Sequence, residues 1–445
     1  RAAQVLEHGP TVGVVSNGPE HPYRRAQSSG CSCLIRPFAA GAPNRPDTTH
    51  RLTGDRELIH GDRNVDVDAS DHTERTGGWG CHVYIPSRGI TPATTKGSPR
   101  DITEGVRDAP RTAPSAHLIF GSDMTAPLPL YLDCDTGIDD TVALAYLLRS
   151  PLVELVGIGT VSGNTDAAQA ARNTLDLLAL AGAPDIPVAV GAHDHLSHPY
   201  SGGAPHVHGA NGIGGVALPE AGNTASYRDA ADLLLELSHA HAGALHILTI
   251  GPVTNIAIAL ERDPSLPSRI AGVTTMGGAA LVPGNITPVA EANIFNDPEA
   301  ADALARADWD VTFVPLDVTM NHILTDSDRG LLLASADPFA RAVGEILDHY
   351  LDFYVPQFGA RLSPLHDPLA AMAAAGAPGI GPGLRVPVVI DTTDGPSRGS
   401  TVVDMRGQRL GPRDHQGVRT RVLFEGSDTL TAHLVSTILG DAAAQ

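Results

Sequence analysis

The chain is poor in basic residues and contains no long hydrophobic run. Its 445 residues carry a formal net charge of −20 and include one lysine, Lys96, so nucleic acid is not the expected partner. No segment reaches the roughly 18 consecutive apolar residues that a membrane-spanning helix needs. The N-terminus has no charged-then-apolar signal pattern. Together these absences predict a cytoplasmic protein that binds neither nucleic acid nor a membrane.

Cysteine is scarce as well. Of the 4 cysteines, only Cys134 lies outside the first 123 residues, which argues against a secreted fold held by disulfides. Cys31, Cys33 and the Cys81-His82 pair match no strong zinc-binding template, and we attribute their presence to chance.

Residues 1–123 show neither helical nor alternating hydrophobic periodicity. They are rich in Arg, Pro, Gly, Thr, Ser and His, and such a composition buries too little apolar surface to offset the entropy lost on ordering. The segment is electrically neutral, so the acidic excess lies in residues 124–445. We expect 1–123 to be a disordered or misassigned N-terminal extension, with translation starting at or near Met124 and residues 124–445 forming the folded domain.

From Met124 onward, predicted strands and helices alternate. The strands are expected at 128–133, 153–160, 244–251, 270–277, 309–316, 385–390, 401–405 and 419–424. The helices are expected at 139–150, 166–181, 254–262, 297–307, 340–355 and 367–375. This alternation predicts an α/β fold with a mostly parallel, doubly wound, Rossmann-like sheet that binds ligands beyond the carboxyl ends of its strands.

Four carboxylates stand within eight residues where the first predicted strand ends: Asp133, Asp135, Asp139 and Asp140. One or two such residues would be ordinary helix caps. Four like charges repel strongly unless something compensates them, and no basic residue follows before Arg149. A hard divalent cation bound through oxygen is the simplest compensation.

Haloacid-dehalogenase-like phosphatases also place two alternating Asp residues after a first strand. They have Thr or Val two positions beyond the second Asp, where this chain has Gly137, and they use a later Lys, which is absent after Lys96. That alternative is therefore the weaker one.

Several shorter polar motifs follow the predicted strands. Each is weak alone, because Gly, Asn and Pro are ordinary turn residues and an Asp before Pro is an ordinary helix cap. They are Gly163-Asn164, residues 251–255, residues 276–278, His206 and His208 in a glycine-rich loop, the loop of Asn285, Glu291 and Asn293, and His366-Asp367-Pro368.

Taken in order, these motifs resemble the inosine-uridine preferring nucleoside hydrolases. The family signature is Asp-x-Asp-(Pro or Thr)-Gly-x-Asp-Asp followed by a small residue, an aliphatic residue and Ala, and residues 133–143 fit it at every position. The shorter motifs follow in the family order. The resemblance runs from about Leu128 to the C-terminus and excludes the first 123 residues.

The resemblance implies a catalytic cation and a general base. Ca²⁺ would be held by Asp135, Asp140, Asp367 and the backbone carbonyl of Ile250, with Asp133 as a supporting residue behind them. Asp135 would also take a proton from the attacking water, and His366 would be the general acid for the leaving base.

The resemblance also implies a ribonucleoside substrate. Ribose hydroxyls would be bound by Asp139, Asn164, Asn285, Glu291 and Asn293, and Met276 would line the sugar pocket. His208, from a mobile loop, and Tyr350 and Tyr354, one helical turn apart, would contact the base.

The purine-specific branch stacks the base between tryptophans. Here Trp309 is the one Trp beyond residue 123 and is expected in the core, so we expect a broad or pyrimidine-leaning enzyme of the inosine-uridine type. The resemblance also implies a dimer or tetramer. A non-catalytic nucleoside- or ribose-binding protein on the same fold is the alternative. Such a protein would be expected to have lost Asp135 or a metal ligand, and this chain keeps them all.

Overall fold

The computed structural model describes residues 126–440. The predictions made for residues 1–123 and for a start at Met124 lie outside this range. Among residues 126–440, no helix combines the length and apolar character needed to cross a bilayer.

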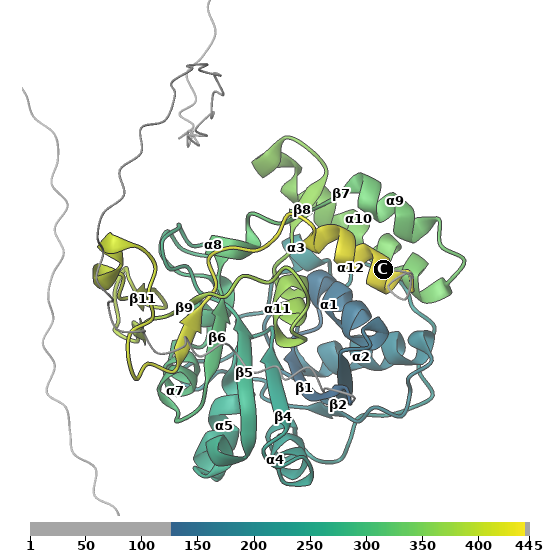
Figure 1. Ribbon diagram of the computed structural model, residues 1–445. Helices are drawn as coiled ribbons and strands as arrows, with labels where there is room; N and C mark the ends of the chain where they lie inside the picture. Colours follow the sequence, from purple (N-terminus) through teal and green to yellow (C-terminus); the bar gives the residue numbers. More distant parts are fainter. Residues whose placement is uncertain (1–125, 441–445) are drawn as a thin grey trace, which may run out of the picture. The chain divides into compact units, whose positions relative to one another are not determined.

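A mostly parallel sheet forms the centre of this region (Figure 1). Its strand order is β3-β2-β1-β4-β5-β6-β12-β9, and each neighbouring pair is parallel except β12 and β9. The strands are β1 (Leu128–Cys134), β2 (Val153–Thr160), β3 (Val188–Val190), β4 (Leu245–Thr249), β5 (Ile270–Met276), β6 (Val311–Val314), β9 (Leu384–Arg385) and β12 (Thr420–Val422). The first six strands follow the doubly wound order, so the predicted fold class is confirmed.

Two small antiparallel pairs accompany this sheet: β7 (Ile323–Thr325) with β8 (Leu362–Pro364), and β10 (Val388–Ile390) with β11 (Thr401–Val403). The helices are α1 (Ile138–Arg149), α2 (Ala167–Ala181), α3 (Pro205–His208), α4 (Ala230–Ala240), α5 (Thr254–Arg262), α6 (Ala292–Asn296), α7 (Pro298–Arg306), α8 (Leu316–Thr319), α9 (Asp326–Leu333), α10 (Pro338–Phe358), α11 (Asp367–Ala374) and α12 (Leu430–Ile438).

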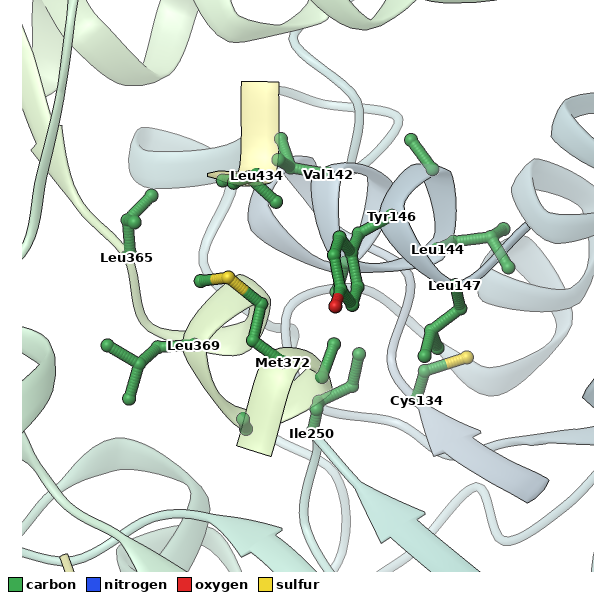
Figure 2. Close-up of a cluster of buried hydrophobic side chains, with 14 of the residues drawn as sticks. Cys134, Val142, Leu144, Tyr146, Leu147, Ile250, Leu365, Leu369, Met372 and Leu434 are labelled. Atoms are coloured by element: carbon green, nitrogen blue, oxygen red, sulfur yellow. The ribbon is translucent and has the colours of Figure 1, made fainter. Parts of the chain in front are cut away.

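Each face of the sheet is covered by its own hydrophobic core, because successive strand residues point to opposite faces. Leu130, Leu132 and Cys134 pack with α1, α11 and α12 on one face. Figure 2 shows Tyr146 of α1 in this core, between Met372 of α11 and Leu147 of its own helix. Tyr131 points to the other face, where α4, α5 and α7 pack. Helix α1 is therefore central, and its residues from Ile138 to Leu147 are all buried.

Local sequence signals explain where the helices begin and end. The Asp166 side chain accepts hydrogen bonds from the backbone N–H groups of Ala168 and Gln169, which caps α2, and Gly182 ends that helix with a left-handed φ of 77°. Asp297 caps α7 in the same way, ahead of Pro298.

The structure differs from the sequence prediction near the C-terminus. The strand expected at 385–390 is two strands, β9 and β10, in different sheets. Pro387 stands between them and has no backbone N–H to continue a ladder. The strand expected at 309–316 is shorter, because Leu316 already begins α8. Trp309 is 2% exposed and belongs to the core, as expected.

The prediction also missed α4, α9 and α12. For α4 the signals were present: Asp229 accepts a hydrogen bond from the backbone N–H of Asp232, and Leu233 and Leu234 lie on the buried face. This helix covers β2 on the face that packs Tyr131.

Replacing the fully buried Leu234 tests the assignment of α4 to the core. Leu234→Ala is expected to lower the free energy of unfolding by about 2–5 kcal/mol, because it removes packed methyl groups and leaves a cavity. Chemical denaturation of the full chain measures this. Leu331→Ala on α9, where the leucine is 54% exposed, is the matched control and is expected to change stability by about 0.5 kcal/mol or less. Equal effects of the two substitutions would contradict the packing described.

Candidate active site

The site lies where the strand order reverses. Strands β1 and β4 are neighbours at the centre of the sheet, and the chain leaves them in opposite directions toward β2 and β5. A doubly wound sheet opens a crevice at such a point, beyond the carboxyl ends of the strands. Asp135 follows β1 and Ile250 follows β4, so both stand at the edge of this crevice.

Gly137 allows the chain to turn sharply from β1 into α1. A Cβ atom at this position would lie 2.6 Å from Nδ1 of His208 and 2.7 Å from Nδ2 of Asn164. Glycine therefore lets segments that are distant in sequence approach the acidic turn closely.

Backbone amides hold two of the carboxylates in place. Asp140 accepts hydrogen bonds from the N–H of Gly137 at 2.8 Å and of Asp135 at 3.2 Å, and from Nδ2 of Asn164 at 3.1 Å. Oδ2 of Asp135 accepts a bond from the backbone N–H of Asn164 at 2.6 Å. The other oxygen of Asp135, Oδ1, is buried and has no hydrogen-bond partner in the structure, and the same is true of Oδ1 of Asp139.

Three buried carboxylates converge beside Asp135. Asp139, Asp140 and Asp367 each offer an oxygen, and these oxygens lie within 4.8 Å of one another. Burial raises the pKa of Asp140 to about 7 and holds the pKa of Asp135 and Asp367 well above the ordinary range, and their mutual repulsion adds to the shift.

This set of donors fits a hard divalent cation. Carboxylate oxygens are the preferred ligands of Ca²⁺, and a cation would compensate the repulsion and satisfy the two unpartnered oxygens. The trio includes Asp139, which the sequence analysis assigned to ribose, and does not include Asp135. The ligand roles of Asp135, Asp140, Asp367 and the Ile250 carbonyl all stay predictions.

Asp133 faces neighbouring side chains and does not line the cavity. It accepts hydrogen bonds from Nδ2 of Asn255 at 3.0 Å and from the hydroxyl of Tyr131 at 3.2 Å. Burial raises the pKa of Asp133 to about 7. Asn255 also donates to the carbonyl of Thr160, which ties the end of β1 to the end of β2.

A cavity of about 550 Å³ is lined by Asp139 and Asp367, whereas Asp135 and Asp140 lie behind its lining residues. It brings together twelve of the residues named from sequence: Asp139, Asn164, His208, Ile250, Met276, Asn285, Glu291, Asn293, Tyr350, Tyr354, His366 and Asp367. They come from segments spread over more than two hundred residues of the chain. Their roles toward a substrate stay predictions.

His366 is held on both sides of its ring. Its Nδ1 lies 2.9 Å from the hydroxyl of Thr319, and its Nε2 lies 3.1 Å from the hydroxyl of Tyr354. Burial lowers the pKa of His366, and the charge of Asp139 opposes this shift. The Tyr350 hydroxyl donates to Oδ2 of Asp139 at 3.0 Å, so this side of the cavity is a connected polar wall.

The sequence suggested that His208 lies in a mobile loop, but the structure places it in a helix. It is the last residue of α3 and is 5% exposed. Its Nδ1 accepts a hydrogen bond from the backbone N–H of Ile138 at 3.1 Å, and its ring lies against that of Tyr350. Burial lowers the pKa of His208 to about 3, so the imidazole is neutral at pH 7.

In the loop that carries Glu291 and Asn293, both side chains form hydrogen bonds to backbone groups. Both carboxylate oxygens of Glu291 accept backbone N–H groups, from Gly278, Asn293 and Ile294. Asn293 donates from Nδ2 to the carbonyl of Ile250 at 2.9 Å. Glu291 therefore shapes the loop, and its carboxylate has fewer free lone pairs for a ligand than the sequence suggested.

Sequence reasoning missed several cavity residues. Met320, Phe353 and Gln357 also line the cavity, as does His206, which was named in its motif but given no role. Phe353 and Gln357 fall on the same face of α10 as Tyr350 and Tyr354, so helical spacing alone pointed to them. No sequence pattern identified Thr319, because the residue to which its hydroxyl bonds, His366, is 47 residues away in the chain.

A comparison with known families decides the identity of this site. The family model described as inosine-uridine preferring nucleoside hydrolase matches residues 130–429. The chain belongs to this family. It is accordingly a hydrolase of N-glycosyl bonds that acts on ribonucleosides, and the phosphatase alternative is excluded.

Individual nucleoside hydrolases show the same likeness. The chain is 38% identical over 248 residues to uridine nucleosidase 1 of Arabidopsis thaliana, covering 55% of this chain and 73% of the relative. It is 36% identical over 278 residues to the pyrimidine-specific ribonucleoside hydrolase RihA of Salmonella enteritidis, covering 62% and 88%. The solved purine-preferring ribonucleoside hydrolase from Gardnerella vaginalis has a TM-score of 0.65 and 31% identity, over 71% of this chain and 99% of that one.

Gly163 provides a test of how tightly Asp135 is held. A Cβ atom at Gly163 would overlap Oδ2 of Asp135, so Gly163→Ala is expected to displace this carboxylate and lower kcat/KM by about 100-fold. Steady-state hydrolysis of uridine measures the effect. Gly222→Ala is the matched control, because a Cβ there meets nothing within 4 Å. If Gly163→Ala hydrolyses uridine as fast as Gly222→Ala does, the close packing around Asp135 is wrong.

Proposed function

We propose that this nucleoside hydrolase cleaves uridine and inosine to the free base and ribose with the help of a bound Ca²⁺. The observation that carries the proposal is the convergence of buried carboxylates at the floor of a cavity that also contains the polar residues expected for ribose. The ion would be held by Asp135, Asp140, Asp367 and the Ile250 carbonyl, with Asp133 as a supporting residue behind them.

Ribose is proposed to bind at the carboxylate end of the cavity. Asp139, Asn164, Asn285, Glu291 and Asn293 would bind its hydroxyls, and Met276 would pack against the ring. Asn285 uses its Oδ1 to accept the backbone N–H of Ala292, which leaves its Nδ2 for a ligand. Buried charged acceptors at this end would also stabilise the positive charge that develops on the sugar as the glycosidic bond breaks.

Asp135 is proposed as the general base. When bound, a divalent cation supplies charge that lowers the pKa of a water in the site. The Asp135 carboxylate would take the proton of the attacking water, and the water oxygen would form the new bond to C1′ of the ribose. The C1′–N bond breaks, and its electron pair leaves with the base.

His366 is proposed to protonate the leaving base. Its Nε2 bonds to the hydroxyl of Tyr354, both residues line the cavity, and imidazole is the side chain that most often transfers protons in catalysis. Tyr350, Tyr354 and His208 would contact the base from the same wall. The relatives include enzymes described as acting on uridine, on pyrimidine ribonucleosides and preferentially on purine ribonucleosides, so we propose a broad base range.

The first test is a turnover panel of uridine, cytidine, inosine, adenosine and guanosine with the full chain. Chelation is expected to lower turnover by about 100-fold or more, because it removes the charge that activates water, and added CaCl₂ is expected to restore it. Release of ribose is the measurement, with MgCl₂ as the comparison ion. Full turnover in excess chelator would contradict the cation, and intact uridine and inosine with CaCl₂ present would contradict the substrate assignment.

A second test addresses the general base. Asp135→Asn keeps the shape of the side chain and loses the basic oxygen, so kcat is expected to fall by about 10²–10⁴-fold. Ribose binding, measured by calorimetry, is expected to stay detectable. A variant that keeps near-normal kcat would remove Asp135 from this role.

A further inference from the structure

Thr319 is a buried residue whose hydroxyl forms a hydrogen bond with His366. It is fully buried at the end of α8 and does not line the cavity. Its Oγ1 lies 2.9 Å from Nδ1 of His366, and this is the one hydrogen bond recorded for that hydroxyl within residues 126–440. Thr319 therefore reaches the cavity only through the histidine.

The helix that carries Thr319 is fixed to the cavity wall. Both carboxylate oxygens of Asp317 accept backbone N–H groups of the loop after β5, from Ala280 and Leu281, at 2.8 Å each. The backbone N–H of Leu316 donates to the carbonyl of Gly278 at 2.9 Å. Because α8 is tied at these points, the Thr319 hydroxyl has a defined position.

The backbone of His366 is fixed from the other side. The N–H of Leu365 donates to the carbonyl of His322 at 2.8 Å, next to the pairing of β7 with β8. This contact sets where the His366 Cα lies, but it leaves the imidazole free to rotate about its side-chain bonds. The Thr319 hydroxyl removes this freedom, because it occupies Nδ1 and so directs Nε2 toward Tyr354 and the cavity.

We infer that Thr319 is a positioning residue for the leaving-group step: its hydroxyl orients the His366 imidazole so that Nε2 delivers a proton to the departing base. This inference rests on the proposed role of His366. A hydroxyl suits the task, since it accepts from Nδ1–H and donates to a bare Nδ1, so it keeps the ring in place in either protonation state. As the C1′–N bond breaks, the proton on Nε2 of the imidazolium passes to the base, while the Nδ1 proton stays in its bond to Thr319 and the ring becomes neutral.

The test compares two leaving groups on the full chain with CaCl₂ present. Uracil needs a proton when it leaves uridine, whereas 4-nitrophenolate leaves 4-nitrophenyl β-D-ribofuranoside without one. Thr319→Val keeps the shape and loses the hydroxyl. It is expected to lower kcat for uridine by about 10–100-fold and to change kcat for the nitrophenyl riboside by about 2-fold or less, with KM for uridine little changed.

Three further variants make the result decisive. Thr319→Ser retains the hydroxyl and is expected to recover most of the uridine turnover. Thr437→Val, which removes another buried threonine hydroxyl that bonds only within α12, is expected to leave both substrates unaffected. Thr319→Cys keeps a similar volume with a weak hydrogen-bonding group and replaces the valine variant if that one does not fold.

Equal losses on both substrates, or no loss on either, would overturn the inference and give Thr319 a structural role only. His366→Ala separates this failure from failure of the proposed function. If His366→Ala loses uridine turnover selectively while Thr319→Val does not, the inference alone is wrong. If His366→Ala keeps its uridine turnover, the acid assignment itself is wrong, and the role of Thr319 is wrong with it.

Discussion

The structure depends on keeping several buried carboxylates close together at the end of its central strand. Asp135, Asp139, Asp140 and Asp367 are each between 1% and 8% exposed, and three of them place oxygens within 4.8 Å of one another. Repulsion between charges in a low-dielectric interior is costly, and no arginine or lysine of the described region forms an ion pair with them. The backbone amides of Asp135, Gly137 and Asn164 offset part of this cost, and two oxygens remain without a partner. A divalent cation would offset the rest.

The strand topology places these carboxylates beside a crevice at the edge of the sheet. The strand order reverses between β1 and β4, so the acidic turn opens into a crevice and not into the core. Tight glycine turns at Gly137 and Gly163 then let Asn164 and His208 approach the carboxylates. A wall beside the carboxylates is built from α8, α10 and the start of α11, where Thr319, Tyr354 and His366 form a continuous hydrogen-bonded chain. The Tyr350 hydroxyl joins this wall to Asp139, so charge and proton-donating groups meet within one cavity.

The sequence predicted the parts of this site that local signals encode. The apolar run before Asp133, the turn at Gly137 and the amphipathic spacing of α2 and α5 depend on near neighbours, and strand β2 and helix α5 have the predicted bounds. The contacts that orient side chains join residues far apart in the chain, such as Thr319 with His366 and Tyr350 with Asp139. Periodicity carries no information on these pairs. For the same reason the burial of His208 was missed: its glycine-rich surroundings are typical of a loop, whereas the ring is packed against α1 and Tyr350.

Calcium titration of the chelator-treated full chain by calorimetry tests the central claim most directly. We expect each chain to bind a single Ca²⁺ and the thermal midpoint to rise with the Ca²⁺ concentration, because the ion binds only the assembled carboxylates. Asp140→Asn and Asp367→Asn are expected to abolish the binding heat. Asp367→Asn is also expected to make the cation-free protein more stable by lowering the repulsion, whereas Asp140→Asn also loses hydrogen bonds from Gly137, Asp135 and Asn164. A chain that gives no binding heat and the same thermal midpoint with and without Ca²⁺ would contradict the account.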